Sequence, residues 1–155
     1  MSADLLETND GIERSRERII KNGEVFTPEC IIEQIVANVP QEDWSNPTKT
    51  FLDPTCGNGQ ILCYILKRRL EAGVSKKDAI STLFGIELMS DNVEMARSRL
   101  ERLLETDQYN SIIEHNIVCS DIFWWNIEKW EPRKEKILIK HKNVFIKDKK
   151  TNSIF

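Results

Sequence analysis

The sequence predicts an α/β fold with a parallel sheet flanked by helices, and two observations lead to this prediction. Helix-like and strand-like stretches alternate along the body of the chain, the order expected of parallel strands joined by helical crossovers. Three of the strand-like stretches lead into an acidic residue, namely Asp53, Glu87 and Asp121, and a glycine-bearing turn follows the first of them. With 155 residues, of which 40% are apolar and 30% charged, the chain suits a single domain.

The first two elements are expected to be helices. Residues 10–22 read as a polar helix, which Gly23 can end. Thr27 is expected to cap the second helix, with Pro28 as its first residue, and Pro40 is expected to end it. The apolar residues of this second helix recur at helical spacing: Ile31, Ile32, Ile35, Val36 and Val39.

The later elements are predicted from turn residues and apolar spacing. In chain order they are a loop at 43–49, a strand at 50–52, a glycine turn at 56–59, a helix that ends at Gly73, a short helix at 76–81, a strand at 82–87, a helix capped by Ser90 or Asp91, and a broken strand signal at 112–119. The two longer helices carry apolar stripes that we expect to face inward: Ile61, Leu62, Ile65, Leu66 and Leu70 in one, and Val93, Ala96, Leu100, Leu103 and Leu104 in the other.

Charge is distributed unevenly along the chain. Between Arg133 and Lys150 there are eight Lys or Arg residues and two acids, whereas the whole chain has a formal charge of −3. This excludes a globally basic nucleic-acid coat protein and predicts an acidic body with a basic C-terminal segment. We expect a helical extension at 1–23, a ligand-binding domain at 24–132 and the basic segment at 133–155. The basic segment is expected to form a hairpin with strands at 136–140 and 143–147.

Cysteine usage and the N-terminus favour a cytoplasmic protein. The four cysteines do not form the close pairs of a zinc or redox motif, so we expect reduced and mostly buried thiols and no metal site; they are Cys30, Cys56, Cys63 and Cys119. No apolar run is long enough to span a membrane, and the N-terminus lacks the features of a signal peptide.

The acids that follow the strands suit an adenosine-bearing ligand. Ligands of parallel sheets bind outside the carboxyl ends of the strands, and glycines allow the backbone to approach them closely. Glu87 is expected to accept hydrogen bonds from ribose hydroxyls, with Leu88 against the adenine face. Asp121 is placed to accept from an exocyclic amine and Asp53 to meet an ammonium group. In the alternative interpretation, the acids only cap helices and the glycines only turn the chain.

Four segments of the chain resemble one known family. They are V-F-T-P at 25–28, F-L-D-P-T-C-G-N-G-Q-I-L at 51–62, F-G-I-E-L at 84–88 and S-D-I-F at 120–123. In this order they are similar to the cofactor half of S-adenosylmethionine-dependent adenine-N6 DNA methyltransferases, which include modification subunits of restriction systems and related phage proteins. The resemblance covers about residues 22–123 and implies a Rossmann-like methyltransferase fold with a truncated sheet.

The resemblance also implies a set of residues that bind S-adenosylmethionine. By position, the first segment would hold the methionine moiety, the glycine turn would line the cofactor loop, and the last two segments would hold the ribose and adenine. The implied residues are Phe26, Thr27, Pro28, Asp53, Pro54, Cys56, Gly57, Gly59, Glu87, Leu88, Asp121 and Ile122.

The catalytic motif of that family has no counterpart here. It reads N-P-P-F, N-P-P-Y or D-P-P-Y, and its aromatic ring stacks on a flipped base, but no Pro-Pro occurs in this chain. The nearest fragments are Asn143-Val144-Phe145, which lacks both prolines, and Trp124-Trp125, which comes too early. The sequence therefore identifies no catalytic residue.

Three interpretations remain open. The chain is an adenine methyltransferase that meets DNA through its basic segment and borrows missing parts from a partner or second copy. Alternatively, it is a non-catalytic S-adenosylmethionine-binding module with a regulatory or assembly role, or a scaffold with a degenerate pocket. An incomplete sheet would leave an unpaired edge, which predicts self-association or a protein partner.

Two basic or aromatic groups give weaker signals. Lys67, Arg68 and Arg69 read as a solvated helix face in preference to a phosphate contact. Trp124, Trp125 and Trp130 suit either base stacking or a packing patch.

Overall fold

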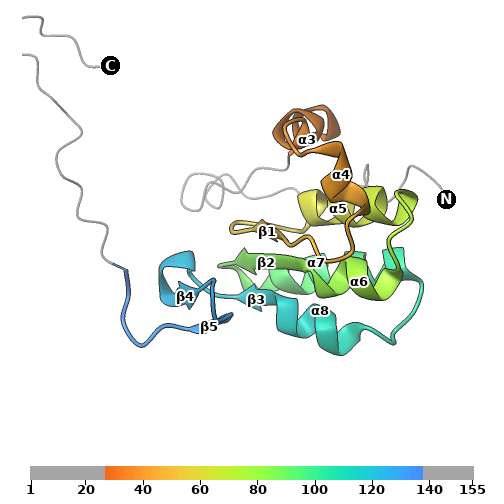
Figure 1. The fold of residues 1–155 in the computed structure, drawn as a ribbon. Helices are drawn as coiled ribbons and strands as arrows, with labels where there is room; N and C mark the ends of the chain where they lie inside the picture. Colours follow the sequence, from red (N-terminus) through yellow and green to blue (C-terminus); the bar gives the residue numbers. More distant parts are fainter. Residues whose placement is uncertain (1–26, 138–155) are drawn as a thin grey trace, which may run out of the picture. The chain divides into compact units, whose positions relative to one another are not determined.

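The computed structural model describes residues 27–137 and divides the chain into two compact units, 1–122 and 123–155 (Figure 1). The predicted basic segment, 133–155, lies within the second unit. The predicted helix at 10–22, Phe26 and the hairpin strands beyond residue 137 lie outside the described residues.

The first unit contains a three-stranded parallel sheet in the order β1-β2-β3, as the α/β pattern predicted. Its strands are β1 (Phe51–Asp53), β2 (Leu83–Glu87) and β3 (Ile117–Cys119). Asp53 pairs with Gly85, and Glu87 pairs with Cys119. Because all three strands run in the same direction, their carboxyl ends share one edge of the sheet, and the acidic residues therefore gather there.

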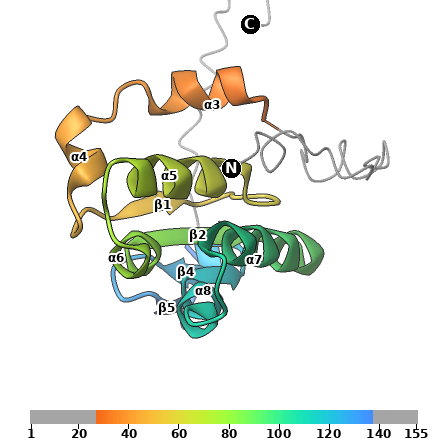
Figure 2. The ribbon, with the colours of Figure 1, turned by 90° about the vertical axis from the view of Figure 1, so that its right-hand side faces the viewer.

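Four helices are grouped around this sheet (Figures 1 and 2). They are α5 (Gln60–Glu71), α6 (Lys76–Ser81), α7 (Ser90–Leu104) and α8 (Asn110–Asn116). Helices α5 and α7 contact each other and β2. All five residues of the apolar stripe predicted for α7 are buried, which confirms its inward face. Helix α6 has the bounds that the sequence predicted.

The two faces of the sheet have different neighbours. A Cβ atom at Gly85 would lie 2.8 Å from Leu62 Cδ1, so this face of β2 lies directly against α5. Side chains alternate along a strand, which places Phe84 on the opposite face, beside its register partner Leu52. Both are half-buried, as is Val118 of β3 on the same face, whereas its register partner Ile86 is completely buried.

The structure corrects the elements predicted before β1. Helix α3 (Glu29–Val36) has Pro28 as its N-cap, with an extended ψ of 149°, and Thr27 lies outside it. Of the five apolar residues at helical spacing only Ile32 and Val36 are buried, and the helix ends at Val36, so the end predicted at Pro40 is wrong.

The predicted loop at 43–49 begins within a helix, α4 (Gln41–Ser45). This short helix buries Trp44, which stacks on Phe51 of β1 with ring centroids 5.3 Å apart. The tertiary contact of the Trp44 indole thus stabilises a short helix that the helix propensity of its residues did not predict.

The segment 112–119, which gave a broken strand signal in the sequence, forms the end of a helix followed by a strand. Helix α8 runs to Asn116, and β3 follows without a linker. Asn116 Nδ2 donates to the carbonyl oxygens of Ile80 (3.0 Å) and Ser81 (3.3 Å), which joins the end of α8 to the end of α6. Short apolar runs do not distinguish helix from buried strand, which explains the error. The caps predicted for α7 are also wrong, because Met89 occupies the N-cap and makes no side-chain cap bond.

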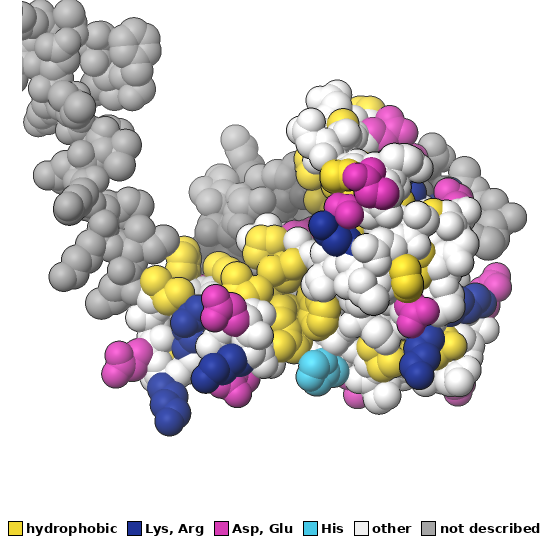
Figure 3. Space-filling view, in the orientation of Figure 1, with side chains coloured by type: hydrophobic (Ala, Val, Ile, Leu, Met, Phe, Trp, Pro, Cys, Tyr) yellow, Lys and Arg dark blue, Asp and Glu magenta, His cyan; other side chains and the backbone are white. Residues whose placement is uncertain are grey.

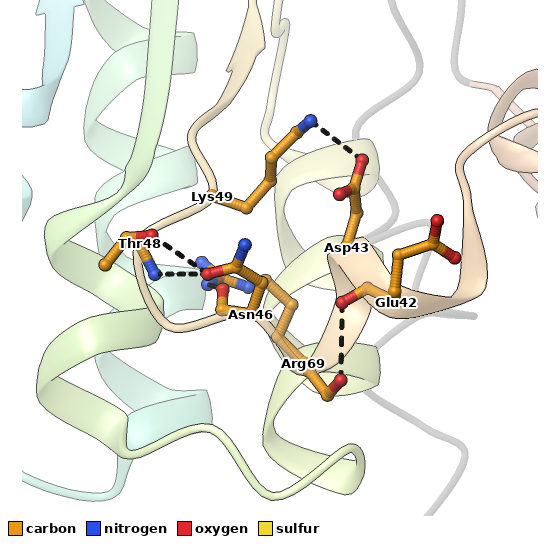
Figure 4. Close-up of polar contacts among 7 residues, drawn as sticks. Glu42, Asp43, Asn46, Thr48, Lys49 and Arg69 are labelled. Carbon is orange, nitrogen blue, oxygen red and sulfur yellow. Dashed lines mark hydrogen bonds and ion pairs between the residues drawn. The ribbon is translucent and has the colours of Figure 1, made fainter.

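Arg69 of α5 contradicts the predicted solvated basic face, because its side chain is completely buried. Its guanidinium donates to the Asn46 carbonyl at 2.8 Å (Figure 4) and also to Ala79 O and Thr82 Oγ1. It lies 5.0 Å from the centroid of the Phe51 ring. Burial lowers the pKa of the Arg69 guanidinium. Arg69 therefore connects the turn before β1 to the end of α6.

The described part of the second unit is a small antiparallel hairpin of β4 (Trp125–Asn126) and β5 (Glu131–Pro132), preceded by the 3₁₀ turn η1 (Ile122–Trp124). The sequence placed its hairpin later, and Lys136 and Ile137, the two described residues of that stretch, are not in a strand. Trp125 and Trp130 pack edge to face across the loop, with centroids 5.5 Å apart.

Two of the four cysteines, Cys56 and Cys63, are buried, whereas Cys30 and Cys119 are exposed, so the expectation of mostly buried thiols is only half met. Burial raises the pKa of the Cys63 thiol to about 12. Between residues 27 and 137 no cluster of side chains suits a metal ion, and no helix there is long and apolar enough to cross a membrane.

Candidate functional site

A cavity of about 440 Å³ lies at the carboxyl ends of the strands in the first unit. Its volume is within the range of small-molecule sites. Nine of the twelve residues that the resemblance implied line it: Thr27, Asp53, Pro54, Cys56, Gly57, Glu87, Leu88, Asp121 and Ile122. Segments far apart in the sequence thus meet at one site.

Of the other three implied residues, two are described and do not line the cavity. Phe26 lies outside the described residues. Pro28 is exposed at the start of α3. Gly59 is buried against α7, where an added Cβ would lie 2.8 Å from Ala96 Cβ. The role of Gly59 in this structure is therefore the close approach of two helices.

Glu87 connects the two loops that border the cavity. Its Oε2 accepts a hydrogen bond from the Gly57 N–H at 3.0 Å, and its Oε1 accepts one from the Met89 N–H at 2.9 Å. A carboxylate oxygen accepts more than one hydrogen bond, so both oxygens retain capacity for a ligand donor. The carboxylate thus holds the glycine turn and the loop after β2 together.

Asp53, which lines the same cavity, carries a buried and unsatisfied acceptor. Its Oδ1 accepts a hydrogen bond from the Thr55 N–H at 3.1 Å, whereas its Oδ2 is buried and has no hydrogen-bond partner among the described residues. Burial raises the pKa of the Asp53 carboxyl, the bond from Thr55 opposes this, and the charge of Glu87 adds to the rise. A cationic donor would relieve both the desolvation and the missing bond.

The raised pKa of the Asp53 carboxyl predicts that Asp53→Asn stabilises the ligand-free protein at pH 7. An acid whose pKa is raised on folding opposes stability above that pKa, because the charged form is favoured in the unfolded chain. The amide removes this charge and retains an acceptor for Thr55. Urea unfolding should show a higher midpoint than wild type at pH 7, and the difference should shrink as pH falls through the raised pKa.

The matched control for this prediction is Asp107→Asn, a change at an exposed carboxylate. It should leave the midpoint near that of wild type at every pH. A lower midpoint for Asp53→Asn at pH 7 would contradict the prediction.

Gln60 is a lining residue that the sequence reasoning missed. Its Oε1 accepts a hydrogen bond from the Thr27 N–H at 3.1 Å, which joins the segment before α3 to the start of α5. The other lining residues that were missed are Thr55, Asn58, Ile61, Ile86, Met89, Asn92 and Ser120. Asn58, Gln60 and Ile61 lie inside the glycine motif, so that motif already carried a signal for them.

Cys56 lines the cavity as an apolar thiol. Burial, together with the charges of Asp53 and Glu87, raises the pKa of the Cys56 thiol far above its ordinary value. The thiolate is the nucleophilic form of cysteine, so this side chain is not equipped for covalent catalysis.

A parallel sheet with crossover helices and a cavity at its carboxyl edge defines the class of Rossmann-like α/β proteins that bind a small ligand beside the first two strands. Residues 14–126 match the family described as N-6 DNA methylase, and the chain belongs to this family. The chain matches no curated protein and no solved structure at a significant level.

Proposed function

We propose that this chain binds S-adenosylmethionine in the cavity and takes part in the methylation of adenine N6 in DNA. The observation that carries the proposal is the buried, unpartnered Oδ2 of Asp53, a residue that lines a cavity large enough for a nucleoside ligand. The ammonium group of the methionine moiety is a cationic donor of the kind that this oxygen lacks. The carboxylate acceptors of the site therefore fit the donors of the cofactor.

The remaining lining residues would hold the other parts of the cofactor. Glu87 would accept from the ribose hydroxyls with the capacity that its two backbone bonds leave. Leu88, which is 59% exposed, would lie against the adenine, with Asp121 and Ile122 beside it. When bound, the cofactor supplies an electrophilic methyl group on a sulfonium sulfur. This chain's residues would orient it and exclude water, because the transfer requires alignment more than acid–base chemistry.

We propose that methyl transfer requires a partner or a second copy of the chain. The chain has no N-P-P-Y-type motif to hold the target amine. In the described part of the sheet, β1 and β3 each pair on one side only, and one face carries the half-buried Leu52 and Val118 beside the fully buried Ile86. Parallel sheets are normally covered on both faces, which supports a further layer. A monomer in sedimentation velocity across micromolar concentrations would contradict a second copy.

The alternative is a non-catalytic S-adenosylmethionine-binding module with a regulatory or assembly role. The missing motif favours it, whereas the family favours catalysis. Transfer of a labelled methyl group to adenine-containing DNA distinguishes the two. In either role we place the protein in the cytoplasm, within a restriction–modification or phage modification system.

Calorimetric titration with S-adenosylmethionine tests the binding site. Asp53→Asn and Glu87→Gln should each weaken binding by about tenfold or more, because each removes a charged acceptor. Affinity of the wild type should also fall as pH drops through the raised pKa of Asp53, whereas Asp53→Asn should lose this dependence. Because Asp53→Asn is expected to stabilise the free protein, weaker binding by this variant would not reflect unfolding.

The control is Glu94→Gln, a change to an exposed carboxylate of α7 outside the cavity. It should bind as the wild type does. The proposed site would be overturned if the wild type showed no saturable binding. It would also be overturned if Asp53→Asn and Glu87→Gln bound as tightly as the wild type and Glu94→Gln.

A further inference from the structure

Large apolar side chains are exposed together on the second unit. Seven large hydrophobic residues are exposed between residues 27 and 137, and four of them belong to residues 123–137: Phe123 (36%), Trp124 (42%), Ile127 (46%) and Ile137 (43%). We refer to these four residues as the apolar cluster. Exposed apolar patches on a protein surface mark interaction sites.

The backbone of the hairpin holds this cluster in place. The Arg133 N–H donates to Trp124 O at 2.7 Å, and the Ile137 N–H donates to Phe123 O at 3.0 Å. In the loop, Asn126 Oδ1 accepts from the N–H groups of residues 128 and 129 at 3.1 and 3.2 Å. The exposed rings therefore belong to an ordered turn, which reduces the entropy cost of binding.

Cations are interleaved with the cluster. Lys136 Nζ lies 5.9 Å from the centroid of the Phe123 ring, and Lys129 and Lys134 are exposed. Figure 3 shows dark-blue Lys or Arg side chains near yellow ones in the region that Figure 1 labels β4 and β5, with acids among them. The sequence of the second unit has nine Lys or Arg and four acids, of which four Lys or Arg and three acids lie among its described residues, 123–137; the sequence of the first unit has thirteen and twenty-one.

We propose that the apolar cluster binds single-stranded DNA, with an unpaired base stacked on the Trp124 ring and with phosphates near Lys134 and Lys136. Exposed aromatic rings beside cations are the elements of single-strand binding surfaces. A duplex keeps its base faces stacked, so this flat ring favours an unpaired base. The positive balance of the unit favours a polyanion over an apolar protein partner. No residue of the apolar cluster is among those that line the cofactor cavity, and only the choice of DNA over RNA rests on the proposed function.

Fluorescence anisotropy of the full chain with labelled oligothymidylate of about ten nucleotides tests this proposal. Trp124→Ala should weaken binding about tenfold, and Trp124→Phe, which keeps a ring, should retain most of it. Lys134→Gln should reduce the slope of log affinity against log salt by about one. The control is Ile35→Ala, which removes an apolar side chain of α3 that is 55% exposed, more than Trp124, and should change nothing.

Three outcomes would overturn the proposal: no binding of the oligonucleotide, equal binding of Trp124→Ala and wild type, or a duplex bound as tightly as the single strand. A concentration-dependent dimer that Trp124→Ala abolishes, without an effect on DNA, would instead assign the cluster to contact between copies. Titration with S-adenosylmethionine should give the same affinity for Trp124→Ala as for wild type. This separates failure here from failure of the cofactor site.

Discussion

Arg69→Ala is expected to lower the free energy of unfolding by about 4 kcal/mol, because it empties a large buried site and removes several hydrogen bonds together. The side chain is 0% exposed, and its guanidinium donates hydrogen bonds to Asn46 O, Ala79 O and Thr82 Oγ1. Two carbonyls would lose a donor in a region that water reaches poorly. Urea unfolding followed by circular dichroism measures the loss.

Two further variants separate the causes of this effect. Arg69→Met fills much of the volume without donors, so it should fall between Arg69→Ala and wild type. Arg68→Ala removes the neighbouring half-buried guanidinium, which lies 4.1 Å from the centroid of the Trp44 ring, and should cost about 1 kcal/mol. Equal losses for Arg68→Ala and Arg69→Ala would show that the hydrogen bonds of Arg69 contribute little.

Gly59→Ala is expected to lower the free energy of unfolding by about 3 kcal/mol through backbone strain and overpacking. Gly59 has a φ of +84°, in the left-handed region that disfavours a side chain. Its added Cβ would also lie 2.8 Å from Ala96 Cβ and 2.9 Å from Ala96 Cα. Because one of these atoms belongs to the backbone of α7, a rotamer change cannot relieve the contact, and the two helices must separate.

Gly73→Ala is the matched control, since Gly73 has a φ of +88° and nothing within 4 Å of an added Cβ. It should show the strain alone, about 1 kcal/mol, in the same urea titration. The difference between the two glycine variants then measures the cost of separating α5 from α7. If both variants lose the same stability, the helix contact at Ala96 is not tight.

Both large effects bear on the geometry of the cavity. Arg69 holds the turn that leads into β1, the strand that ends at Asp53. Gly59 brings α7, which follows the loop after Glu87, close to the start of α5. The residues of the cavity thus depend on packing at positions that do not line it.

Local signals were sufficient for much of the fold. The apolar stripes of α5 and α7, the bounds of α6 and the strand ending at Glu87 could be predicted because spacing and turn residues are properties of the chain itself. Helix α4 could not be predicted from local signals, because it depends on the packing of Trp44 on Phe51. The burial of Arg69 could not be predicted either, since an arginine beside Lys67 and Arg68 has the local pattern of a solvated helix face.

By itself, the sequence determined that three acids follow successive parallel strands, that a glycine turn follows the first, and that the chain carries the motifs of one family. Only the tertiary structure decided that Glu87 joins two loops through backbone bonds, that Asp53 buries an unpartnered oxygen, and that Gly59 serves helix packing. The physical reason is the range of the interactions. Periodicity and turn chemistry act over a few residues, whereas burial and hydrogen-bond satisfaction depend on groups brought together from distant parts of the chain.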